Sequence, residues 1–185
     1  MIDMEYKLIE AVGTGDTLAF ETLIKRYRNS VLNFIYKYVG DRFSAEDLAQ
    51  EVFLRVYSSA AEFEPRGKVS TWIFKIAYNL SANEILRRNR LCLLADAVEE
   101  KGIELGAPNS FEGDELKETL MECIQRLPEK QKAALLLRAN EELSYSEISN
   151  VLSTSVSSVE SLLFRARENL RKMLKEKLED ESGSR

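Results

Sequence analysis

The segment from Ser70 to Arg90, STWIFKIAYNLSANEILRRNR, combines the only tryptophan of the chain with two more aromatic residues, several amides and a basic end. A helix turns by about 100° per residue, so Thr71, Lys75, Tyr78 and Asn79 share one side of it. Aromatic rings can stack on exposed bases, and basic side chains neutralise phosphates. The pattern predicts either a helix that holds unpaired DNA or an amphipathic core helix with a solvated face.

The residues around this helix add two candidate contact surfaces. The loop before it, Glu62 to Ser70, contains a Pro-Arg-Gly turn and two basic residues, and its free backbone groups could hold an extruded base. The alternative is an ordinary connecting loop. The preceding helix, expected to start at a capping box beginning at Ser44, turns Asp47, Gln50, Glu51 and Leu54 outward. An exposed leucine among polar residues suggests a partner surface, although single exposed leucines are common.

The C-terminal part contains two apparent capping boxes, Ser144-Tyr-Ser-Glu147 and Ser157-Ser-Val-Glu160, spaced 13 residues apart. They predict two short helices separated by a tight turn near Ser153. This is a helix-turn-helix pattern, which helical hairpins outside DNA-binding proteins also share. The apolar contacts between the two helices are expected from Ile148, Val151, Leu152, Val156, Val159, Leu162 and Leu163.

Composition predicts an all-α chain of two small helical domains, because its 185 residues include only eight glycines and three prolines. We expect N-terminal helices near Met4 to Val12, Thr17 to Val39, Ser44 to Ser59 and Ser70 to Arg90. The formal net charge is −5, but residues 95–118 hold eight carboxylates against two lysines. The expected division is therefore residues 1–95, an acidic linker at 96–112 that is either a solvated tether or lies in a basic channel of a partner, and residues 113–185.

Several classes of function are disfavoured. The chain contains no histidine, and its two cysteines, Cys92 and Cys123, are far apart, so neither a metal site nor a disulfide framework is expected. We expect free thiols in a reducing cytoplasm, no cofactor and no membrane insertion. The carboxylates suggest no catalytic pair, so an enzyme is the least favoured class.

Four motifs together resemble the extracytoplasmic-function (ECF) sigma factors. They occur in order over nearly the whole chain: DLAQEVF at 47–53, STWIFKIAYN at 70–79, LPEKQ at 127–131 and VESLLFRAR at 159–167. The resemblance implies a bacterial transcription initiation factor that binds core RNA polymerase and promoter DNA, with an anti-sigma factor expected as a further partner. It also implies that the acidic linker threads towards the active centre of the polymerase.

The resemblance also assigns roles to residues of this chain. The residues expected to contact core polymerase are Asp47, Gln50, Glu51 and Leu54. Those expected to melt and hold the −10 element are Arg66, Lys68, Ser70, Thr71, Lys75, Tyr78, Asn79, Asn83 and Arg87. Those expected to read the −35 element are Ser155, Ser157, Ser158, Glu160, Ser161, Arg165 and Arg167.

Departures from the family pattern keep other functions open. Glu160 and Leu162 stand where the family usually has basic residues, and Leu86 stands where many relatives have arginine. Glu160 could accept a hydrogen bond from a cytosine amino group, although its simpler role is the cap with Ser157. The runner-up function is a sigma mimic that binds an anti-sigma factor as a decoy without recognising promoters. A helix-turn-helix regulator unconnected with polymerase leaves the motif at 47–53 unexplained.

Overall fold

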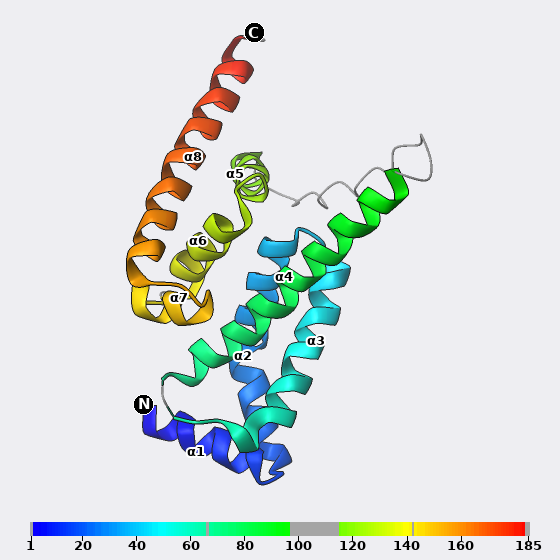
Figure 1. The fold of residues 1–185 in the computed structure, drawn as a ribbon, viewed down its shortest axis with the longest axis vertical. Helices are drawn as coiled ribbons and strands as arrows, with labels where there is room; N and C mark the ends of the chain where they lie inside the picture. Colours follow the sequence, from blue (N-terminus) through cyan, green and yellow to red (C-terminus); the bar gives the residue numbers. More distant parts are fainter. Residues whose placement is uncertain (1, 66, 97–114, 142, 184–185) are drawn as a thin grey trace.

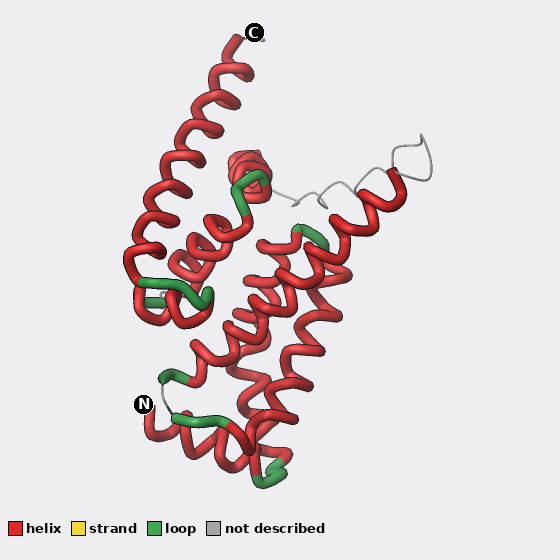
Figure 2. Tube along the Cα trace, in the orientation of Figure 1, coloured by secondary structure: helices red, strands yellow, loops and turns green. Residues whose placement is uncertain are grey.

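The computed structural model describes residues 2–65, 67–96, 115–141 and 143–183. Within these ranges the chain forms eight α-helices and one short 3-10 helix, and Figure 2 shows only helices and their connections there. The expected acidic linker falls almost entirely on 97–114, outside the described residues. The elements are α1 (Ile2–Gly13), α2 (Thr17–Val39), α3 (Arg42–Ser59), η1 (Ala60–Glu62), α4 (Val69–Asp96), α5 (Glu115–Gln125), α6 (Glu129–Glu141), α7 (Tyr145–Val151) and α8 (Val156–Gly183).

In the N-terminal half, helices α1, α3 and α4 pack around α2 (Figure 1). Leu23, Val31, Phe34 and Ile35 of α2 are fully buried, because apolar residues recur along it at helical spacing. Asp16 caps the N-terminus of α2 with hydrogen bonds from two backbone amides, and Gly40 ends the helix in the left-handed conformation at φ 80°. The predicted bounds of this helix, 17 to 39, are confirmed.

The start of α3 differs from the expected capping box at Ser44. The helix begins at Arg42, and its N-cap is Asp41, whose carboxylate accepts a hydrogen bond from the Ser44 amide at 2.9 Å. Arg88 of α4 also reaches Asp41, at 3.1 Å, and Ser44. The Ser44-x-x-Asp47 pattern was misleading because a better cap lies three residues earlier, where a second helix adds a cationic partner.

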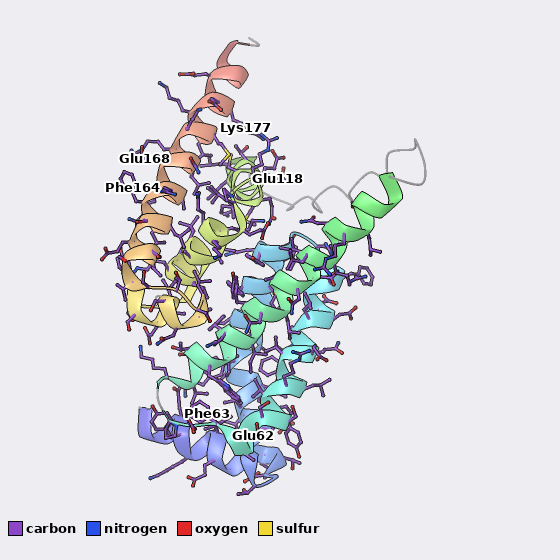
Figure 3. The ribbon with its side chains drawn as sticks, in the orientation of Figure 1. Glu62, Phe63, Glu118, Phe164, Glu168 and Lys177 are labelled. Atoms are coloured by element: carbon purple, nitrogen blue, oxygen red, sulfur yellow. The ribbon has the colours of Figure 1, made fainter. Side chains whose placement is uncertain are left out.

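The last four helices form the C-terminal half, in which α6, α7 and the first half of α8 enclose Leu137, Ile148, Val159 and Leu163. The rest of α8 runs alongside α5, where Lys177 pairs with Glu122 (Figure 3). Buried apolar residues form one continuous cluster from Ile9 in α1 to Leu163 in α8, so the two halves are packed against each other. None of the described helices is long and apolar enough to cross a membrane.

Replacing Asp41 with alanine should lower the free energy of unfolding of the N-terminal half by about 1 to 2 kcal/mol, because the α3 cap and a partner of Arg88 are both lost. Urea denaturation followed by the fluorescence of Trp72 measures this change. The hydrogen bonds that the Asp41 carboxylate accepts from Ser44, and then from Arg88, hold the pKa of Asp41 below its ordinary value despite partial burial. The stabilisation should therefore be present at neutral pH and lost as the pH falls through that lowered pKa.

The matched control is Glu46→Ala on the same helix, which removes only the exposed ion pair with Arg42. Its effect should stay within about 0.5 kcal/mol. Equal destabilisation by the two variants would contradict the role given to Asp41.

Candidate functional site

One face of α4 carries a stripe of exposed polar side chains. Lys75, Asn79 and Asn83 are all exposed and are spaced four residues apart, so they lie one above another on the helix surface. On the opposite side, Ile73, Phe74, Ala77 and Leu80 are buried against the N-terminal half. The stripe offers one ammonium group and two amides to a ligand running along the helix.

Two residues expected to be exposed on that face, Thr71 and Tyr78, are instead buried and half-buried. Thr71 is only 6% exposed, and its hydroxyl has no hydrogen-bond partner among the described residues. Tyr78 is half-buried and packs edge-on against Tyr38 of α2, with ring centres 5.9 Å apart. Burial, followed by the nearby carboxylate of Glu129 in α6, raises the pKa of Tyr78. The outward orientation predicted for Thr71 is wrong, because its side chain is buried. Helix α4 packs against α7 as well as against its own half.

The loop before α4 is held by contacts at both ends. Phe63 packs between Trp72 and Tyr6, and the Tyr6 hydroxyl donates a hydrogen bond to the Gly67 carbonyl at 3.0 Å. The ammonium of Lys68 lies 2.7 Å from the carboxylate of Glu147 in α7. Ser70 is half-buried, and Arg66 lies outside the described residues. Lys68 is therefore engaged by the C-terminal half.

The pKa of Glu147 reflects this contact. Burial acts to raise it, but the hydrogen bonds from Lys68 and Ser144 outweigh burial and hold the pKa of the carboxyl below its ordinary value. Glu147 is therefore charged at neutral pH, and its attraction for Lys68 is present there.

The basic end of α4 is largely structural rather than free for phosphates. Arg87 and Arg88 both donate hydrogen bonds to Glu84, and Arg88 also bonds Asp41 and Ser44. Arg87 remains mostly exposed and could still meet a phosphate. The side chain of Arg88 joins α4 to the start of α3 and is therefore engaged within the protein.

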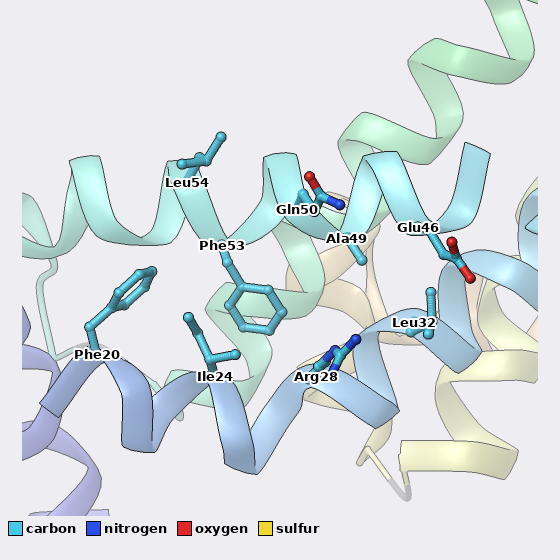
Figure 4. Close-up of a pocket in the computed structure, with 9 residues that line it drawn as sticks. All are labelled: Phe20, Ile24, Arg28, Leu32, Glu46, Ala49, Gln50, Phe53 and Leu54. Carbon is cyan, nitrogen blue, oxygen red and sulfur yellow. The ribbon is translucent and has the colours of Figure 1, made fainter. Parts of the chain in front are cut away.

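A groove of about 470 Å³ lies between α2 and α3 (Figure 4). Gln50 and Leu54 lie on its α3 side, and Leu54 is 63% exposed. Asp47 is exposed on the same helix, while Glu51 is half-buried and pairs with Arg55 at 2.8 Å. The lining residues are Phe20, Ile24, Arg28, Leu32, Glu46, Ala49, Gln50, Phe53 and Leu54.

Sequence reasoning missed the α2 side of this groove. Phe20, Ile24, Arg28 and Leu32 recur every fourth residue in a helix whose bounds were predictable. That spacing could have indicated one shared face. The spacing alone does not show whether neighbouring helices cover this face of α2 completely or leave part of it exposed.

The helix-turn-helix is formed by α7 and α8. Ser144 and Glu147 make the expected capping box, with the Ser144 amide donating to the Glu147 carboxylate at 2.8 Å. The turn places Ser153 at a positive φ of 49°. The second expected capping box is wrong, because α8 begins at Val156 and the Ser158 amide donates to the Ser155 hydroxyl at 3.2 Å.

This earlier start changes the roles of the neighbouring residues. Ser157 and Glu160 lie inside the first turns of α8 and do not cap it, and Val156 is exposed rather than buried. Within the described residues, Glu160, Arg165 and Arg167 have no ion pair, and all three are exposed. A shallow depression on this surface is lined by Lys130, Thr154, Ser157, Ser158, Ser161, Leu162 and Arg165.

Comparisons with known proteins match two separate parts of the chain. The family profile described as "Sigma-70 region 2" matches residues 23–91, and the one described as "Sigma-70, region 4" matches residues 117–170. The chain is 34% identical over 183 residues to the RNA polymerase sigma-H factor of Pseudomonas aeruginosa, covering 93% of this chain and 94% of that protein. It is 31% identical over 180 residues to the ECF RNA polymerase sigma factor SigW of Bacillus subtilis, covering 92% and 96%.

A solved structure shares the fold. The sigma factor RpoE, in its co-crystal structure with the anti-sigma factor NepR from Bartonella quintana, matches with a TM-score of 0.70 and 20% identity. The match covers 84% of this chain and 96% of that one.

Replacing Ser155 with alanine should destabilise the C-terminal half by about 1 kcal/mol, because the N-cap of α8 is lost. Ser157→Ala is the matched control, since Ser157 lies inside the helix, and its effect should stay within about 0.5 kcal/mol. Thermal unfolding followed by circular dichroism measures both variants. A larger effect at Ser157 than at Ser155 would restore the capping box expected from the sequence.

Proposed function

This chain belongs to the ECF group of RNA polymerase sigma factors, which are transcription initiation factors, and from that premise we propose which surface binds polymerase and which surfaces bind promoter DNA. The α2/α3 groove binds core polymerase, the exposed stripe of α4 holds the −10 strand, and the surface of α8 reads the −35 element. The proposed domains are residues 1–95 and 113–185, joined by the acidic segment 96–112.

The observation that carries the polymerase assignment is the open apolar groove with Leu54 on its rim. Phe20, Ile24 and Phe53 supply apolar surface, while Gln50, Arg28 and Glu46 supply polar groups around it. Such a groove suits a partner helix that buries apolar side chains and satisfies polar groups at its edges. Asp47 and Glu51 extend the polar rim along α3.

The −10 assignment is supported by the chemistry of the α4 stripe. Asn79 and Asn83 can each donate to and accept from the edge of an unpaired base, and Lys75 can neutralise a phosphate. Thr71, Tyr78 and Lys68 belong to the same proposed site, although Thr71 is buried, Tyr78 is half-buried and Lys68 is paired with Glu147 of α7. Arg66, Ser70 and Arg87 complete the proposed site.

The −35 assignment is supported by the exposed start of α8. Ser157, Ser158 and Ser161 supply small hydroxyl groups that can read a base edge, and Arg165 and Arg167 are available for phosphates. Ser155 caps the helix and fixes where it begins. Because Glu160 does not cap the helix, its carboxylate can accept a hydrogen bond from a cytosine amino group.

The proposal also includes the location of the protein and the kind of protein that regulates it. We place the protein in the cytoplasm, where it meets RNA polymerase. An anti-sigma factor is the proposed regulator, because RpoE of Bartonella quintana, which shares the fold, is solved in complex with one.

The test of the polymerase assignment is Leu54→Ala, measured as the dissociation constant for purified core RNA polymerase. Removing an exposed anchor from the rim should weaken binding by about tenfold, or about 1.4 kcal/mol, and leave folding intact because the side chain is exposed. Phe43→Ala is the matched control, since Phe43 is 81% exposed on the same helix but does not line the groove. Unchanged binding by Leu54→Ala, or equal weakening by both variants, would reject the groove as the docking site.

A further inference from the structure

A depression on the C-terminal half lies where the first turn of α6 meets the start of α8. Its lining includes Lys130 of α6, Thr154 of the turn before α8, and Leu162 and Arg165 of α8. We propose that this depression holds duplex DNA, with Lys130 and Arg165 bound to phosphates of its backbone. In the same contact, Ser161 and Leu162 select an A·T base pair. The inference rests on the −35 assignment above and deepens it by naming the base pair and the additional residues.

The charge of the depression is opposite to that of the whole chain. The chain has a formal net charge of −5, whereas the lining of the depression contains two cations, four hydroxyl side chains and no carboxylate. Lys130 and Arg165 are exposed, and neither has an ion pair within the part of the chain that the structure describes. Binding a phosphate would therefore cost neither side chain an existing partner.

Lys130 supplies a positive charge that α8 lacks. At position 162, where the family pattern has a basic residue, this chain has a half-buried leucine that packs against the apolar cluster. A basic side chain at 162 would enter the depression from α8, whereas Lys130 enters it from α6. A phosphate contact carries no information about the base. Lys130 is therefore expected to fix the position of the duplex on the two helices without selecting its sequence.

The hydroxyl group of Ser161 is oriented by its own helix. It donates a hydrogen bond to the Ser157 carbonyl oxygen, one turn earlier, at 3.0 Å. A serine hydroxyl has one proton and two lone pairs, so the Ser161 oxygen remains an acceptor for a ligand. Glu160 is exposed, and its carboxylate is also only an acceptor. The side chains of residues 160–162 therefore offer acceptors and apolar surface but no donor.

This set of groups distinguishes base pairs in the major groove. Guanine presents two acceptors there, N7 and O6, which need donors from the protein. An A·T pair presents the adenine amino group, which is a donor, and the thymine methyl group. The Ser161 oxygen can accept from the amino group while Leu162 covers the methyl group. The depression therefore favours A·T over G·C at the base pair it contacts, and the cytosine contact proposed for Glu160 concerns a neighbouring pair.

The first test is a selection of DNA by the full chain bound to core RNA polymerase. Duplexes randomised across the −35 region are incubated with the complex, and the retained fraction is sequenced. At one position the parent chain should enrich A·T over G·C by about fivefold or more. Leu162→Arg should change the enriched pair at that position to G·C, because arginine donates to guanine N7 and O6. Circular dichroism checks that this variant is folded.

The second test changes the DNA instead of the protein. Replacing the thymine of the enriched pair with uracil removes only the methyl group, so the affinity of the parent complex should fall about threefold. Leu162→Ala should bind the thymine and uracil duplexes equally. Uracil in place of thymine outside the enriched pair is the matched control and should change the affinity of neither chain.

Lys130→Ala tests the phosphate contact. It should weaken binding of the complex to all sequences by the same factor and reduce the slope of log affinity against log salt by about one. Lys172→Ala is the matched control, because Lys172 is 77% exposed on α8 and does not line the depression. It should leave both quantities unchanged.

An enriched pair that stays the same in folded Leu162→Arg, or equal affinity of the parent complex for thymine and uracil, would overturn the selection of an A·T pair. Equal behaviour of Lys130→Ala and Lys172→Ala would overturn the phosphate contact. Failure of the −35 assignment itself would appear differently, as a parent complex that retains no sequence above core polymerase alone, and the inference would fail with it.

Discussion

Apolar side chains along α2, from Leu23 to Tyr38, pack against α1, α3 and α4 at once. This packing fixes the angle between α2 and α3 and so leaves the groove open between them. It also holds the buried side of α4 in place, which turns Lys75, Asn79 and Asn83 outward. The end of the same helix accepts Lys132 from the C-terminal half. Both proposed surfaces of the N-terminal half and the contact between the halves therefore depend on one helix.

The groove and the exposed stripe of α4 share no residue, so a partner bound in the groove leaves Lys75, Asn79 and Asn83 available. A polymerase that binds both halves of the chain would present both proposed DNA-reading surfaces on one assembly. Two weak DNA contacts joined in this way give specific binding that neither provides alone. A chain with a net charge of −5 is consistent with such dependence on its partner.

Local sequence signals predicted what depends on local interactions. The bounds of α2 and the Ser144 capping box follow from helix periodicity and short-range hydrogen bonds, and both are confirmed. The cap of α3 was missed because Arg88, distant in sequence, contributes to it. The burial of Lys132 was not predictable from periodicity, because α6 also packs against α2 of the other half. The sequence pattern identified residues of α3 that lie on the groove but not the residues of α2 that line its other side.

Promoter-directed transcription tests the central claim most directly. Purified core RNA polymerase is supplied with this chain and with promoter fragments from the chain's own genome, and the transcripts are mapped at their 5′ ends. The account predicts discrete transcripts that appear only when the chain is present and that begin at a fixed distance downstream of shared −35 and −10 sequences. No transcript from any fragment, while the chain still binds an anti-sigma factor, would contradict the account and identify the chain as a decoy.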